Sequence, residues 1–90
     1  MKEFLPMGSI VRLKESKKKL MITGRLQKRT GEPKIFDYIA IFYPIGSVDN
    51  HVVLFDEDDI GELVFRGFCD IEEQEFVKFL NQSIEEAREG

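Results

Sequence analysis

The sequence predicts a single α+β domain, in which about five antiparallel strands form a meander or a half-open barrel and one C-terminal helix closes the chain. Three observations predict this class: segments with strand-like alternation or composition, short connections containing Gly or Pro, and a change to helical periodicity after Asp70. Short connections join antiparallel neighbours, because parallel strands need long crossovers. Ninety residues, of which 42% are hydrophobic, are enough for one domain with a core, spanning 1–90.

The first two strands are expected at about 9–14 and 19–28, joined by a polar turn. In the first, Val11 and Leu13 alternate with basic residues, as in a half-buried strand. The second also alternates, and Gly24 inside it predicts a bulge or a close backbone approach. The pair is expected to form a hairpin.

Three further strands are expected at about 35–43, 51–55 and 61–68. The segment 35–43 is apolar on both faces and rich in aromatics, which predicts a central strand covered on both sides. The acidic run 56–59 separates the last two strands as a loop or a single helical turn.

The helix is expected at about 71–88. Asp70 and Glu73 have the spacing of a capping box. Glutamates fill the first turn, where their negative charge interacts favourably with the positive end of the helix dipole. Apolar residues then recur at intervals of three and four, which predicts one buried stripe. Its members are Phe76, Phe79, Leu80, Ile84 and Ala87.

Charge divides the chain into a basic third and an acidic remainder. Residues 1–34 hold ten Lys/Arg against three Asp/Glu, and residues 35–90 hold three against fourteen. The sequence pI of about 5.0 disfavours nucleic acid as a partner. The basic cluster Lys17, Lys18 and Lys19 keeps that alternative open, although its hairpin has no aromatic side chain on which a base could stack.

Composition excludes several classes. One cysteine, Cys69, allows neither an internal disulfide nor a cysteine-based zinc site within one chain, and a lone thiol suits the cytoplasm. No run approaches the ~20 apolar residues of a membrane span, and no signal-peptide pattern begins the sequence.

No catalytic, cofactor-binding or metal-binding set is predicted, so the chain is not expected to be an enzyme. His51 and Cys69 each lack a catalytic partner in the sequence. The run 56–59 lacks the alternate spacing of an EF-hand loop, so a solvated turn or an acidic contact surface is the preferred interpretation.

Partner binding is the remaining interpretation, because eight Phe in a small domain can leave some on an uncovered face. Core packing is the alternative for each aromatic. The candidate partner-binding residues are Phe36, Tyr38, Phe42, Tyr43, Lys17, Lys18, Lys19, Asp56, Glu57, Asp58 and Asp59. A self-paired edge strand would make a homodimer.

Four blocks, at 5–14, 18–27, 36–46 and 55–68, resemble the domain-of-unknown-function family 4176 (DUF4176) of Gram-positive bacteria. The resemblance implies a small cytoplasmic protein encoded among type VII (ESX-like) secretion genes. Its implied role is that of a non-enzymatic accessory, chaperone or targeting factor for a secreted LXG toxin. The family has no established catalytic residues to carry over. A nucleic-acid-binding small barrel and a toxin-immunity protein are the alternatives.

Overall fold

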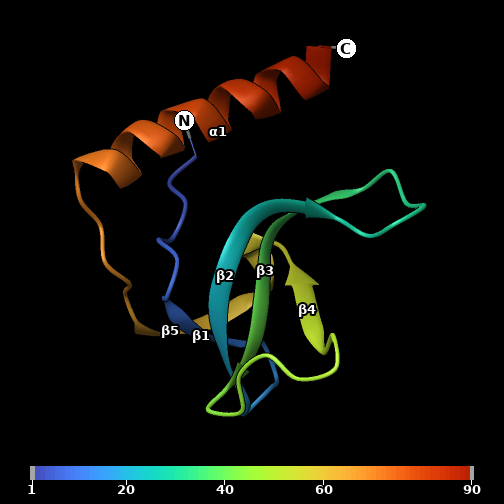
Figure 1. Cartoon of the computed structure of the whole chain (residues 1–90), viewed down its shortest axis with the longest axis vertical. Coiled ribbons are helices and arrows are strands. Elements are labelled where there is room, and N and C mark those ends of the chain that lie inside the picture. The colour runs from blue at the N-terminus through green and yellow to red at the C-terminus, as the bar shows by residue number, and fades with distance from the viewer. Residues whose placement is uncertain (1, 90) are drawn as a thin grey trace.

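The fold is an antiparallel sheet followed by one helix, and the computed structural model describes residues 2–89, with side chains as far as Glu86. The strands are β1 (Ile10–Leu13), β2 (Lys19–Lys28), β3 (Ile35–Tyr43), β4 (Val52–Phe55) and β5 (Ile60–Phe65). A 3-10 turn, η1 (Glu57–Asp59), joins β4 to β5, and α1 (Ile71–Glu89) ends the described chain (Figure 1). The predicted α+β class, with a half-open sheet and one C-terminal helix, is confirmed.

The sheet is strongly curled. Its strand order is β4-β3-β2-β1-β5, so the first four strands form a meander and β5 returns to pair with β1. The two edge strands are therefore consecutive in sequence and are linked only by 56–59. A link that includes a 3-10 turn, rising ~2 Å per residue, cannot cross a flat sheet about 19 Å wide. The edges must approach each other, and Figure 1 shows the resulting curl.

The predicted boundaries hold for the two long strands and differ at the last one. The segments expected at 19–28 and 35–43 are β2 and β3. The strand expected at 61–68 starts at Ile60 and ends at Phe65. It ends there because the chain turns towards α1, and the Gly67 amide donates to the buried Ser9 Oγ at 2.9 Å.

Gly24 produces the bulge that the sequence predicted. The β2–β3 register shifts between Ile22 and Gly24, and Leu26 follows with a φ of 53°. A Cβ at Gly24 would lie 2.9 Å from Ile39 Cγ2, so any other residue at this position would force the Ile39 side chain to shift. The bulge bends β2 and turns Arg25 inward, where its side chain is buried.

The core fills the concave side of the sheet. Tyr38 lies at its centre, with the ring of Phe55 5.5 Å away and that of Phe4 6.1 Å away. The buried apolar side chains are Phe4, Leu5, Val11, Leu20, Ile22, Tyr38, Ala40, Phe55 and Leu80.

Helix α1 is fastened to the N-terminal segment. Asn81 Oδ1 accepts from the Lys2 amide at 2.8 Å, and Asn81 Nδ2 donates to the Lys2 carbonyl at 3.0 Å. Leu80 enters the core beside Phe4 and Leu5. In Figure 1 the N-terminal segment runs from α1 down to β1, so it connects the helix with the sheet. Among the described residues, no helix is long and apolar enough to cross a membrane.

The buried stripe of α1 differs from the expected one. Its inward residues are Val77, Leu80, Asn81 and Ile84, which share one face at helical spacing. Phe76 and Phe79 were expected in this stripe but lie on the exposed side, because the core accepts the neighbouring column. Ala87, the last expected member, lies outside the described side chains.

Candidate functional site

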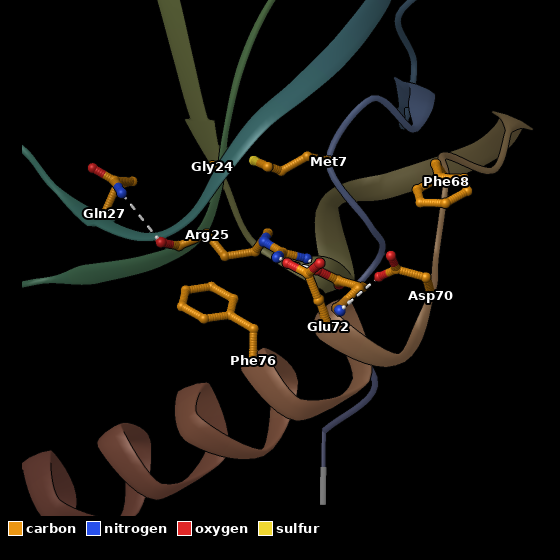
Figure 2. A pocket seen from close by; sticks show the side chains of 9 residues that line it. Met7, Gly24, Arg25, Gln27, Phe68, Asp70, Glu72 and Phe76 are labelled. Atoms are coloured by element: carbon orange, nitrogen blue, oxygen red, sulfur yellow. Dashed lines mark hydrogen bonds and ion pairs between the residues drawn. The ribbon is translucent and has the colours of Figure 1, made fainter.

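A groove runs between α1 and the bend of β2, and we call it the α1 groove. It has a volume of about 770 Å³. Met7, Phe68 and Phe76 provide its apolar lining, while Asp70 and Glu72 lie at its acidic end. Figure 2 shows Met7 and Phe76 on different sides of the Arg25 side chain.

The floor of the α1 groove is a buried ion pair. Arg25 Nη1 and Nη2 donate to the two carboxylate oxygens of Glu73, each at 2.7 Å, and Nη1 also donates to the Leu5 carbonyl at 2.9 Å. The Phe76 ring centroid lies 5.6 Å from the guanidinium carbon. Since Arg25 is already bonded within the chain, it is a structural cation rather than a free anion-binding group.

The start of α1 explains how Glu73 comes to face Arg25. Asp70 Oδ1 accepts from the Glu73 amide at 3.0 Å, as the N-cap spacing predicted. In a full capping box the Glu73 carboxylate would return to the cap amide. Here it binds Arg25 instead, so the second half of the box is replaced by a tertiary contact.

Exposed apolar side chains continue from β5 along α1. The exposed fractions are 59% for Phe65, 80% for Phe68, 75% for Ile71, 46% for Phe76 and 56% for Phe79. The Phe76 and Phe79 rings stack with centroids 5.8 Å apart. We call these five residues the apolar strip, and such a set on a small domain is typical of a partner site.

A second hollow of about 300 Å³ extends the α1 groove along the helix. Leu26, Ile35, Phe79 and Ile84 are among its lining residues, and Arg25 lines both hollows. This site was not predicted from the sequence, because Phe76 and Phe79 were expected in the core and Phe65 and Phe68 in a strand. One available signal was that Val77, Leu80 and Ile84 alone already make a complete helical stripe.

The structure brings several predicted partner-binding residues together at the opposite end of the sheet. Lys19 pairs with Tyr43 in the β2–β3 ladder, which sets the basic turn beside aromatic rings. Lys18 Nζ lies 5.3 Å from the Phe42 ring centroid, and Lys19 Nζ lies 5.7 Å from that of Tyr43. We call this the lysine hollow; it measures about 670 Å³ and is lined by Lys17, Lys18, Lys19, Phe42, Tyr43, Pro44, Ile45 and His51.

Two other predicted aromatics lie elsewhere. Phe36 is half-buried, with Lys34 Nζ 4.6 Å from its ring centroid. Tyr38 is fully buried; its hydroxyl accepts from the Leu5 amide at 2.9 Å and donates to the Glu57 carboxylate. Burial and the bond to Glu57 raise the pKa of this hydroxyl well above its ordinary value. Tyr38 is therefore a core residue with no surface to offer a partner.

The acidic run 56–59 serves local structure. Asp56 begins η1, and its carboxylate accepts from the Asp37 amide and the Lys34 ammonium, each at 3.1 Å. Partial burial raises the pKa of Asp56, but these hydrogen bonds and the charges of Lys34 and Lys2 outweigh it, so the net pKa is lowered. Glu57 is bonded to Tyr38, whereas Asp58 and Asp59 are exposed. The run is distinct from the lysine hollow, whose lining contains none of its residues.

The remaining chemically competent side chains that the structure describes do not assemble into a centre. His51 lies exposed in the lysine hollow, and Cys69 is exposed in the loop before α1. Across the described residues, no group of three or more His, Cys, Asp or Glu is placed to hold a metal ion. The arrangement offers contact surfaces.

Comparison with known proteins places the chain in a family. No curated protein and no solved structure matches it. The family model described as domain of unknown function (DUF4176) matches residues 4–76, which contain all five strands and the start of α1. The match includes Arg25, Glu73 and Phe76, and thus the floor of the α1 groove. Because it covers far more than half of the 90 residues, the chain belongs to the domain-of-unknown-function family 4176.

Proposed function

We propose that this protein is a non-enzymatic binding protein that holds a segment of another protein along the α1 groove. The observation that carries the proposal is that two residues of the apolar strip, Phe68 and Phe76, line this groove while they are 80% and 46% exposed. When a partner covers exposed aromatic surface next to a concave hollow, removal of that surface from water contributes favourably to the free energy of binding.

The groove favours a particular kind of segment. Met7, Phe68 and Phe76 would contact apolar side chains, whereas Asp70 and Glu72 at one end would pair with a basic residue. The occupant that fits is therefore an apolar segment followed or preceded by Lys or Arg. Arg25 supports the floor without contacting the ligand as a free charge, since its guanidinium is bound to Glu73 and Leu5.

The proposed client is an LXG toxin of a type VII (ESX-like) secretion system in a Gram-positive bacterium. The four sequence blocks that resemble family 4176 support this choice, and a chaperone or targeting factor requires only a docking surface. In this proposal the protein acts in the cytoplasm, before the toxin is exported.

Co-expression with the N-terminal region of the neighbouring toxin tests the proposal. We expect the two proteins to co-purify, and the Phe68→Ser/Phe76→Ser variant to lose at least ten-fold in affinity, the equivalent of about 1.4 kcal/mol. The matched control is Val48→Ser/Val52→Ser, which removes two exposed apolar side chains away from the groove and should bind as the wild type does.

Two results would contradict the proposal. One is failure to co-purify together with unchanged toxin export after deletion of the gene. The other is equal loss of binding in the groove variant and the control. Protection of cells from the toxin's active domain, without any effect on export, would indicate the immunity alternative instead.

A further inference from the structure

Helix α1 carries an acidic and aromatic face that stays exposed, although Phe76 also contacts Arg25 at its inner edge. Glu72, Glu75, Phe76 and Phe79 are spaced i, i+3, i+4 and i+7, so they share one side of the helix. All four are exposed. This face therefore combines negative charge with a stacked aromatic pair.

The lysine hollow has the complementary composition. Its rim holds Lys17, Lys18 and Lys19, and none of its described lining residues is a carboxylate. Its walls are the rings of Phe42 and Tyr43 together with Ile45, which is 70% exposed. A positively charged rim around aromatic walls matches an acidic face with an aromatic centre, because both charge and apolar contact are satisfied at once.

The two surfaces cannot meet within one molecule. In Figure 1, α1 crosses the upper end of the long axis, and the β1–β2 turn and the β3–β4 loop lie at the lower end. The molecule extends 36 Å along this axis. At physiological ionic strength the Debye length is only about 8 Å, so the two charged ends scarcely interact in one copy.

We propose that the lysine hollow of one copy binds the acidic and aromatic face of α1 of a second copy, in a head-to-tail contact. A second copy fits better than nucleic acid for two reasons. Three lysines neutralise few phosphates. In addition, the net charge of −4 on the chain repels a polyanion.

A head-to-tail contact has consequences that a symmetric dimer lacks. Each copy uses one surface of each kind, so association continues into rings or chains. The contact also covers Phe76 and Phe79. This inference stands without the client-binding proposal; where both hold, a client and a second copy compete for α1.

Charge reversal tests the contact directly. One variant is Lys17→Glu/Lys18→Glu/Lys19→Glu and the other is Glu72→Lys/Glu75→Lys; all five side chains are at or near the surface. By sedimentation velocity at low salt, we expect wild-type protein to associate beyond a dimer with rising concentration, and each variant alone to stay monomeric. Mixing the two variants should restore association, because each supplies the surface that the other has lost.

The control is Glu3→Lys/Glu32→Lys, which changes the net charge as much as the α1 variant does but lies outside both surfaces, and it should associate as the wild type does. The contact is refuted if wild-type protein stays monomeric at low salt, or if the mixed variants remain apart. Association that resists both salt and charge reversal would also refute the contact and would point to pairing of β5 edges. Binding of an oligonucleotide at the lysine hollow of monomeric protein would likewise refute the contact.

Discussion

Arg25 and Glu73 form the contact on which the α1 groove depends. The Arg25 side chain is 2% exposed and that of Glu73 is 13% exposed, so the charges are largely removed from water. Burial of an ion pair gives little net stability, but removal of one partner leaves an uncompensated charge. The pair thus fixes the position of α1 more than it adds to the free energy of folding.

We predict that Glu73→Gln lowers the free energy of unfolding by about 3 kcal/mol, because Arg25 stays buried without its counter-charge. Urea denaturation measures the effect, with the exposed neighbour Glu72→Gln as control. The double variant Arg25→Met/Glu73→Leu should recover most of the loss. A Glu73→Gln effect as small as that of Glu72→Gln would show that the ion pair is dispensable.

A carboxylate with a lowered pKa predicts a loss of stability in acid. Asp56 keeps its charge below its ordinary pKa of 3.8 in the folded state, so it stabilises the fold above this pH and the contribution disappears as pH falls through the lowered value. We expect the stability difference between wild type and Asp56→Asn, followed by urea denaturation, to be greatest near neutral pH and to shrink below about pH 4. A difference for Asp56→Asn that grows in acid would contradict the assignment.

At the scale of elements, the connection from β5 to α1 is held by close backbone packing. A Cβ at Gly67 would lie 2.3 Å from the Met7 carbonyl oxygen and 2.8 Å from the Ser9 amide nitrogen. Neither atom can move without disturbing the start of β1. The direction in which the chain leaves β5 therefore depends on glycine at this position.

We predict that Gly67→Ala destabilises the fold by about 3 kcal/mol, through overpacking against the backbone. Gly61→Ala is the comparison, since its added methyl would meet the Lys14 backbone at 3.2 Å and needs only a small adjustment. Thermal unfolding of both variants gives the measurement. If the two variants lose equal stability, the close backbone contacts at Gly67 are not the cause of the destabilisation.

The elements themselves were largely predictable, whereas their exposure was not. Alternation along β2, the apolar run of β3 and the cap at Asp70 are local signals, and each marked its element correctly. The return of β5 to β1 is a long-range pairing that no local pattern specifies. The exposed side of α1 was missed for a related reason, because which helical column the core accepts depends on the shape of the whole sheet.

The candidate surfaces show the same limit. The sequence indicated Lys17, Lys18 and Lys19 but found no aromatic near them along the chain; Phe42 and Tyr43 reach them only through the β2–β3 register. Tyr38 and Tyr43 belong to the same aromatic-rich segment of the sequence. Tyr38 is nevertheless buried, whereas Tyr43 is 47% exposed. Strand alternation distinguishes faces, but the curl of the sheet decides which face is enclosed.

At the scale of the whole molecule, the sheet and α1 are connected through few contacts. The helix is held by the inward side chains Val77, Leu80 and Ile84, by the Arg25–Glu73 pair and by the Asn81–Lys2 bonds, whereas the strands share backbone ladders. Regions with fewer tethers open at lower free energy than the rest of a domain. We infer that α1 separates from the sheet before the sheet unfolds.

We predict that Asn81→Leu speeds hydrogen exchange of the α1 amides several-fold and leaves the β2 and β3 amides nearly unchanged, because it removes the two bonds to Lys2 and the bond from Asn81 Nδ2 to the Val77 carbonyl but none within the sheet. The control is Gln82→Leu, on the exposed side of the helix. Hydrogen exchange followed by mass spectrometry resolves the two regions. Equal acceleration in helix and strands would mean that the domain opens as one unit.

The bonds between Lys2 and Asn81 can form only after α1 has been synthesised. Their residues are 79 positions apart, so the N-terminal segment leaves the ribosome long before the helix that fastens it. At a synthesis rate of roughly 5–20 residues per second, Phe4 and Leu5 wait for several seconds without the Leu80 side chain that later joins them. Until α1 has been synthesised, the side of the core that Leu80 will cover therefore stays open.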